Sequence, residues 1–385
     1  MVYRRSSRKL SELSAQSQIT EAEAIQREHR KTSYHLLASK NKLPKDPEES
    51  SDYLYSYLTS TRLPTDKTPH ELAIQTAKKK LIMELAQNGG SVETDRFSEI
   101  LEELVKLHDP FKFDARDRPS PPKKVAMKID KKKGFMLEPH LEGMWISLSQ
   151  PKYFDCLGFN KEGDPMYTLG RMSFEMFRPT QLVCSIRGTF NSIKVIHSKE
   201  RRDIIEHAPK SLRKELERGE GILRTYKLIT AFAVEPWNSS MGGKSPNRSL
   251  QRPLEGLMTT NSYVLANPEK PDRLSIWFTG GSIEMNNNGC DSDRDMELWC
   301  SLFRDAPERG FREKFRMFGA RVAMGASFPD GMESDGKMSY HLNRPIGGHK
   351  VAFVDLLYLD ETLRIVRASS GSVHVMVRVP SLSHE

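Results

Sequence analysis

Short runs in which apolar and polar residues alternate fill the second half of the chain. The clearest pair lies at the C-terminal end, where residues 358–367 and 372–379 flank a four-residue turn segment that contains Gly371. One face of the second run carries only valine, at Val373, Val375, Val377 and Val379. This pattern predicts a β-hairpin with one apolar face. Because a lone hairpin is marginal in water, the preceding chain is expected to supply a sheet for it.

Further runs of this kind begin near Leu141 and recur along the chain, at residues 143–148, 171–176, 182–187, 191–197, 222–235, 256–265, 273–285, 313–324 and 349–359. Roughly ten short alternating runs predict a closed antiparallel barrel or a sandwich. The chain shows no βαβ alternation, which disfavours a doubly wound fold. Two insertions interrupt the series: a charged helix within residues 198–220, and a polar segment at 286–310 that holds a short apolar helix.

Helical periodicity appears before the strands. Apolar residues recur at helical spacing over residues 68–87, and Asn88-Gly89-Gly90 then ends the helix. A second helix is expected to begin after Thr94 as its N-cap and to end near His108. These two elements predict a helical hairpin, at residues 66–110, whose apolar sides pack on a larger body.

The remaining segments complete the predicted organisation. Residues 1–65 form a polar extension that is largely disordered or helical, and residues 111–136 form a basic linker rich in proline and lysine. The barrel is expected at residues 137–380. The first ten residues are basic and rich in serine, but acidic residues follow from Glu12, so a transit peptide is not clear.

The net charge of the chain indicates the class of partner that it favours. The net charge of +8 over 385 residues favours an anionic partner. The basic linker offers candidate membrane contacts at Lys123, Lys124, Lys131, Lys132 and Lys133, although a solvated linker explains the same lysines. We expect no nucleic acid partner, because the basic runs do not accompany an RNP-like aromatic strand. The sequence has no run of eighteen apolar residues that would predict a transmembrane helix.

Motifs give no support for an enzyme. No P-loop, dinucleotide fingerprint or nucleophile elbow is present. Residues 291–295 begin like a calcium loop, but Met296 and Leu302 occupy the positions of its glycine and glutamate. The four cysteines form no C-x-x-C pair. We therefore expect no catalytic residues, no metal and no cofactor. The alternative is a barrel enzyme that takes a catalytic pair from distant strands.

Methionine and phenylalanine are frequent on the strand-like runs. Such residues suit an irregular apolar ligand, although ordinary core packing explains any one of them. A barrel of about eight strands can hold one small ligand. The candidate cavity residues are Trp145, Met172, Phe174, Met176 and Phe232.

Three stretches resemble the plastid lipid-associated protein family, also called fibrillins or plastoglobulins. Residues 80–110 resemble the family's helical entry, and Leu141-Glu-Gly-Met-Trp145 resembles its first strand. The third stretch, from Tyr358-Leu-Asp360 through Leu363-Arg-Ile-Val-Arg367 to the valine-rich run after Gly371, resembles its closing motif. The chain looks like a divergent member.

The resemblance implies a mainly β (α+β) protein: a lipocalin-like antiparallel β-barrel that follows a helical hairpin and a polar N-terminal extension. It implies binding of an isoprenoid, carotenoid or acyl lipid, or coating of a membrane, at plastid thylakoids or plastoglobules. Trp145 would close the barrel floor, with Arg367 or Arg378 packed over it. Asp360 and Arg364 would pair as structural residues near the closing strands. A further alternative is a scaffold for a thylakoid protein complex.

Overall fold

The computed structural model describes residues 68–107, 141–208, 210–217, 222–236, 250–267, 270, 272–286, 293–304, 326–327 and 331–379. Eight antiparallel strands in these residues close into a β-barrel, as the sequence predicted. The barrel strands are β1 (Gly143–Ser147), β4 (Val183–Val195), β5 (Arg224–Val234), β6 (Leu254–Ala266), β7 (Arg273–Met285), β10 (Phe353–Leu359), β11 (Leu363–Ala368) and β12 (Val373–Arg378).

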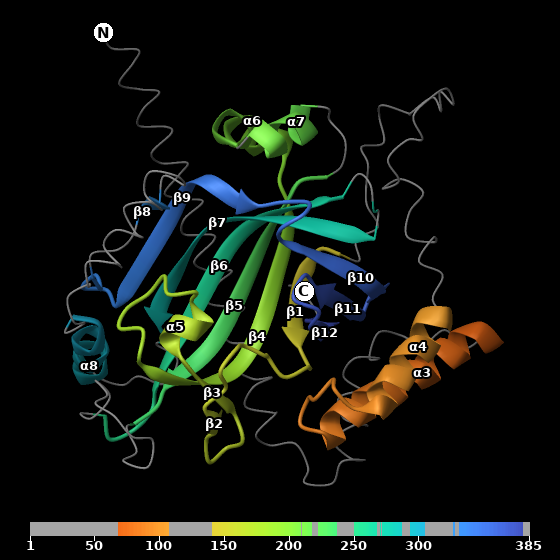
Figure 1. Cartoon of the computed structure of the whole chain (residues 1–385), viewed down its shortest axis with the longest axis horizontal. Helices are drawn as coiled ribbons and strands as arrows, with labels where there is room; N and C mark the ends of the chain where they lie inside the picture. The colour runs from red at the N-terminus through yellow and green to blue at the C-terminus, as the bar shows by residue number, and fades with distance from the viewer. Residues whose placement is uncertain are drawn as a thin grey trace, which may run out of the picture. The chain divides into compact units, whose positions relative to one another are not determined.

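Strand β1 closes the barrel because it pairs on both of its edges (Figure 1). One edge lies antiparallel to β12, with Trp145 opposite Arg378. The other edge lies antiparallel to β4, with Trp145 opposite Asn191. The predicted terminal hairpin is confirmed as β11–β12, and Gly371 has the positive φ of 88° that its turn requires. The predicted runs 182–187 and 191–197 form one continuous strand, β4.

Beyond the closed part, the sheet continues on both sides of the long strands β4–β7. The added strands are β2 (Gly158–Phe159), β3 (Pro165–Thr168), β8 (Ala326–Ser327) and β9 (Lys337–Gly347). Strand β9 pairs with the second half of β7, while β10 pairs with the first half. The sequence analysis missed β9. The strand expected at residues 313–324 lies outside the described residues.

The helical hairpin is confirmed as α3 (Pro69–Gln87) and α4 (Asp95–Leu107), which lie beside β10–β12 and β1 in Figure 1. Thr68 and Glu71 form a capping box at the start of α3. The Thr94 hydroxyl accepts the backbone N–H of Phe97 at 3.0 Å, as its predicted N-cap position requires. The apolar sides of both helices pack on the outward residues of the terminal hairpin, including Ile365 and Val375.

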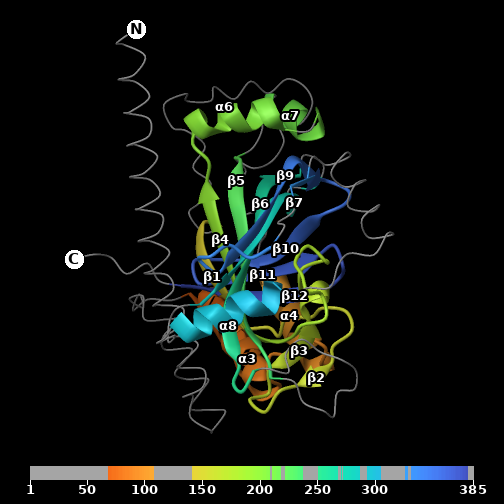
Figure 2. The same ribbon diagram turned by 90° about the vertical axis from the view of Figure 1, so that its left-hand side faces the viewer.

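Both predicted insertions contain helices. The first holds two, α6 (Ser198–His207) and α7 (Lys210–Glu217), instead of the single helix expected. They lie at one end of the long strands (Figures 1 and 2), where Leu212 and Leu216 pack on Trp277 of β7. The second holds α8 (Asp293–Arg304) near the opposite end, and its Trp299 packs into the core there.

The strand predicted at residues 171–176 is wrong. Residues Leu169–Met172 form the short helix α5, and the Thr168 hydroxyl caps its N-terminus. Phe174 and Glu175 then take the left-handed backbone conformation, with φ values of 51° and 61°. Phe174 is 77% exposed, so it cannot line a barrel interior. The alternation of methionine and phenylalanine in this stretch comes from a helix and a turn.

Two apolar clusters occupy the concave side of the sheet. The first surrounds Trp145 inside the closed barrel and includes Tyr226, Val264 and Met376. The second lies where β9 replaces β10 and includes Phe232, Met258 and Trp299. Phe278 of β7 packs against both clusters. The concave surface is therefore continuous from one end of the long strands to the other.

Candidate functional site inside the barrel

Two arginine side chains pack against Trp145 in the barrel. The tryptophan is fully buried, and its indole N–H donates to the Leu141 carbonyl at 3.0 Å. The guanidinium carbons of Arg378 and Arg364 lie 4.4 and 4.8 Å from the ring centroid. Distances of this size fit cation–π contacts. Gly143 permits the arrangement, because a Cβ at that position would lie 2.7 Å from Nη1 of Arg378.

Of the two arginines that were expected to pack over Trp145, the structure places one there. Arg378 packs over Trp145 as expected. Arg367 does not, because its side chain points outward from β11 and is exposed. Arg364 is the second arginine that packs against Trp145, and the sequence analysis missed it. The alternation in β11 gave the signal: Leu363 and Ile365 pack under the helical hairpin, so Arg364 between them points inward.

The expected pairing of Asp360 with Arg364 is wrong. Asp360 accepts a hydrogen bond from Lys78 of α3 at 2.7 Å and another from the Tyr358 hydroxyl at 2.5 Å. Burial works to raise the pKa of Asp360, but the charge and hydrogen bonds of Lys78, with those of Tyr358 and Thr362, lower it to about 2. Asp360 therefore joins the helical hairpin to the barrel wall.

A belt of polar side chains crosses the inner wall between the two apolar clusters. This interior polar belt consists of Thr189, Asn191, Thr230, Ser262 and Arg364, all of which are buried. The Arg364 guanidinium donates to the Asn191 carboxamide oxygen. The strand register places Thr189 opposite Thr230, and Asn191 two residues further along the same face of β4. Five polar residues from four strands therefore line this part of the inner wall.

Beside the belt, three inward-facing side chains are only half-buried: Leu228, Thr260 and Phe278. Leu228 pairs with Thr260, and Phe278 pairs with Ser262, which lies two residues from Thr260 on β6. Leu228 lies on the same face of β5 as the buried Tyr226 and Phe232. Side chains that point into a packed core lose almost all exposure. The inner wall is therefore not completely covered by neighbouring side chains at this level.

The positive charge of Arg364 dominates the belt. Arg364 is 1% exposed, and burial with the nearby charge of Arg378 lowers its pKa to about 10, despite the opposing effect of Tyr226. At neutral pH it stays protonated. Burial and the Arg364 charge also lower the pKa of His374, which lies on the inward face of β12. The positive charge of Arg364 therefore favours binding of an anion at the interior polar belt.

The candidate cavity residues fall into different places. Trp145 lies in the cluster inside the closed barrel, while Met172 and Phe232 lie in the second cluster, and Met176 packs against its edge. Phe174 is exposed and is removed from the set. None of the retained residues belongs to the half-buried group beside the belt. Pairing register, which the sequence analysis lacked, is what identifies Leu228, Thr260 and Phe278.

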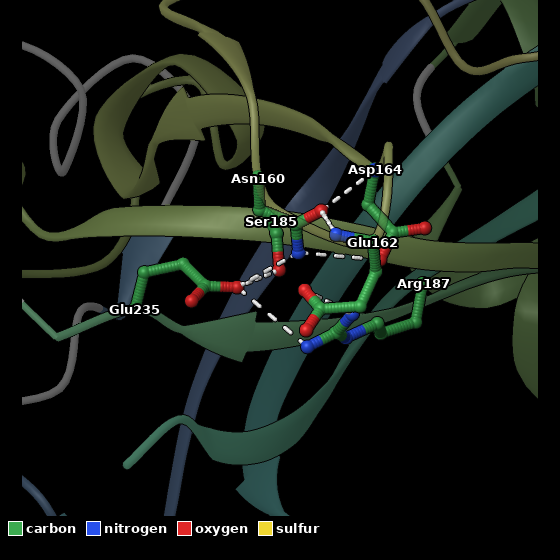
Figure 3. A network of polar contacts seen from close by, with 6 residues as sticks. All are labelled: Asn160, Glu162, Asp164, Ser185, Arg187 and Glu235. Atoms are coloured by element: carbon green, nitrogen blue, oxygen red, sulfur yellow. Dashed lines mark hydrogen bonds and ion pairs between the residues drawn. The ribbon is translucent and has the colours of Figure 1, made fainter. Parts of the chain in front are cut away.

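A second polar network lies on the outward side of the sheet (Figure 3). Arg187 of β4 forms ion pairs with Asp164 and, at 3.6 Å, with Glu235, while the Ser185 hydroxyl donates to Glu235. Asn160 donates to Glu235 at 3.2 Å. Burial works to lower the pKa of Arg187, but the surrounding carboxylates raise it. The network therefore fastens the turn between β2 and β3 to β4 and β5.

Replacing Arg187 with methionine is expected to lower the free energy of unfolding by about 2 kcal/mol, because the variant leaves partly buried carboxylates without their cation. Urea denaturation measures this change. The matched control is Arg171→Met, which removes the exposed pair with Asp155 and is expected to cost less than about 1 kcal/mol. Equal effects of the two variants would contradict a structural function for the network.

Other predicted features receive no structural test. The linker lysines, Lys123, Lys124 and Lys131–Lys133, lie outside the described residues, as does Cys290. In the ranges that the structure describes, no three His, Cys, Asp or Glu side chains gather as metal ligands would. No helix in those ranges is long and apolar enough to cross a membrane.

The chain was compared with protein-family models, with curated proteins and with solved structures. None of the three comparisons found a match. The candidate site consequently rests on the barrel's own geometry: an arginine-flanked tryptophan, a buried polar belt and a half-buried inner wall beside it.

Proposed function

We propose that this protein binds one small apolar molecule inside its barrel and acts as a carrier, with no catalytic step. The observation that carries the proposal is the half-burial of Leu228, Thr260 and Phe278 on the inner wall. Closed barrels of about eight strands have an interior wide enough for one small ligand. Apolar clusters on both sides of the half-buried wall would surround the body of such a molecule.

The resemblance to plastid lipid-associated proteins supports the same class of ligand. It adds an isoprenoid, a carotenoid or an acyl lipid as candidate molecules, and the surface of a thylakoid or plastoglobule as the place of action. The Gly-x-Trp at Gly143–Trp145 and the closing strands carry this resemblance, and both lie in the barrel. The basic linker would then contact anionic lipid, at about 1 kcal/mol for each basic residue near the surface.

The test uses N-phenyl-1-naphthylamine, an uncharged apolar probe whose fluorescence rises when water is excluded. We expect saturable binding of one probe per chain. Leu228→Trp fills the inner wall and should weaken binding at least tenfold, as expected when a ligand's space is occupied by a side chain. The matched control is Ile229→Trp, since Ile229 is the next residue of β5 and points outward.

The two variants separate interior from surface binding. Loss of probe binding in Leu228→Trp alone supports the proposal. Equal binding by both variants would place the probe on the surface and overturn it. Thermal unfolding of each variant checks that a loss of binding does not come from a loss of the fold.

A further inference from the structure

Arg364 has hydrogen-bonding capacity that its protein neighbours do not use. Its Nη2 group donates to Asn191 and lies 2.7 Å from the Met376 sulfur. Its Nε–H is buried and has no hydrogen-bond partner in the part of the chain that the structure describes. A buried donor without a partner costs free energy in the absence of a ligand or water. Arg364 is therefore the group on the inner wall that most favours an added acceptor.

The charged and titratable neighbours of Arg364 do not neutralise it. On β12 they are His374 and Arg378, and on β5 the neighbour is Tyr226. The neighbouring carboxylates Glu361, Asp360 and Glu142 work to raise the pKa of Arg378 against the effect of burial, and Glu142 also lies 3.5 Å from Arg224. The environment of Arg364 therefore combines positive charge with low exposure, and it would gain from a bound anion.

A second unsatisfied group lies at the same level. The Thr189 hydroxyl is buried and has no hydrogen-bond partner among the described residues. Thr189 is two residues from Asn191, so both side chains project from β4 into the barrel. Asn191 in turn contacts Arg364. The two unsatisfied groups thus belong to one connected patch, next to the half-buried Leu228 opposite Asn191.

We propose that Arg364, Asn191 and Thr189 bind the carboxylate of an amphipathic monoanion, whose apolar chain lies along Leu228 and Phe278. The inference rests on the proposed function and specifies its ligand. An acyl chain with a terminal carboxylate has this chemistry.

The chemistry of the patch favours a carboxylate. The guanidinium of an arginine presents its N–H donors in a fixed plane that matches the two oxygens of a carboxylate. One buried guanidinium balances one negative charge, whereas a phosphate monoester would bring close to two. An uncharged isoprenoid would leave both Nε of Arg364 and the Thr189 hydroxyl without a partner. The two unsatisfied groups therefore favour a fatty-acid-like ligand over the neutral alternatives.

The test displaces N-phenyl-1-naphthylamine with three ligands that share one chain: oleate, oleyl alcohol and oleyl phosphate. Oleate is expected to compete at least about tenfold better than oleyl alcohol, because hydrogen bonds to a charged group are stronger when both partners are ionised. Oleyl phosphate is expected to compete less well than oleate. In Arg364→Gln, oleate and oleyl alcohol should compete equally.

Thr189→Val provides a second variant that retains side-chain shape. Removing an unsatisfied hydroxyl should leave the ligand-free protein as stable as the original or more stable. Oleate binding should nevertheless weaken about threefold to tenfold, since the hydroxyl would be a ligand contact. This pairing of unchanged stability with weaker binding is not expected of a residue that only supports the fold. It also keeps the proposal testable if Arg364→Gln fails to fold.

The outcomes distinguish this inference from the proposed function. If oleyl alcohol competes as well as oleate, the barrel binds apolar molecules and the carboxylate site is overturned. Stronger competition by oleyl phosphate would overturn the assignment of a carboxylate. If the probe itself does not bind, the proposed function fails. Unchanged oleate binding in Thr189→Val would remove Thr189 from the site.

Discussion

Replacing Trp145 with alanine is expected to lower the free energy of unfolding by about 4 kcal/mol, the largest effect of any single change considered. The indole is fully buried at the strand that closes the barrel. Its removal leaves a cavity and takes away the ring over which Arg364 and Arg378 pack. The buried Arg364 and the partly buried Arg378 would then lie beside a void.

Urea denaturation measures this effect. Trp145→Phe keeps an aromatic face for the arginines but loses the hydrogen bond to Leu141, so an intermediate loss is expected. Phe154→Ala serves as the control, because Phe154 is 80% exposed and its removal leaves the core unchanged. A loss below about 1 kcal/mol for Trp145→Ala would contradict the closing function of β1.

The second large effect is expected at the contact between α3 and the barrel. Asp360→Asn should lower the free energy of unfolding by about 2 kcal/mol at neutral pH. The amide keeps the shape of the side chain but loses the charge that pairs with Lys78. It also weakens the acceptor used by the backbone N–H groups of Thr362 and Leu363.

The pH dependence of stability provides an independent test of the contact between Asp360 and Lys78. The pKa of Asp360 in the folded protein is about 2, below its ordinary value of 3.8. The stabilisation is therefore fully present above the ordinary pKa and is lost as pH falls through about 2. Between these values the free energy of unfolding should fall more steeply in the original protein than in Asp360→Asn.

An exposed pair on the same hairpin supplies the control for this prediction. Lys80 and Glu103 are joined at 3.2 Å, and both side chains are nearly half exposed. Glu103→Gln should therefore change stability by less than about 1 kcal/mol. Parallel acid curves for the original protein and Asp360→Asn would contradict the assigned contact with Lys78.

Much of the fold could be predicted because the helix caps and the apolar periodicities in the sequence agree with the packing of the folded chain. The capped helices of the hairpin and the valine face of β12 have clear periodicities, and both pack as their apolar sides require. Strand β9 was missed although its sequence carries the signal: Met338, Tyr340 and Leu342 alternate with polar residues and are buried. Its high content of polar residues concealed that alternation.

The error at residues 171–176 has a different cause. A period of two over six residues does not distinguish a strand from a four-residue helix followed by a left-handed turn. Asp155, Phe174 and Glu175 are the residues other than glycine with positive φ in the described part of the chain, and propensity favours such a position for aspartate but not for phenylalanine or glutamate. Phe174 was assigned to a cavity because it was placed on this strand. Since the strand is wrong, the cavity assignment is wrong as well.

The candidate site depends on pairings between distant residues. Asn191 and Arg364 are separated by 173 positions, and their contact follows from closure of β4 on β1 and β12. Sequence patterns placed each residue on a strand but supplied neither register nor the curvature that closes the barrel. The contact between Lys78 and Asp360, across 282 positions, could not be predicted for the same reason.

Native mass spectrometry of the protein purified from its own source tests whether the barrel holds a ligand. Each 44.0 kDa chain is expected to carry the added mass of one small amphipathic molecule, which denaturation releases. Accurate mass and fragmentation of the released molecule would show an apolar chain with a carboxylate. A bare chain that also takes up neither oleate nor oleyl alcohol would contradict binding inside the barrel.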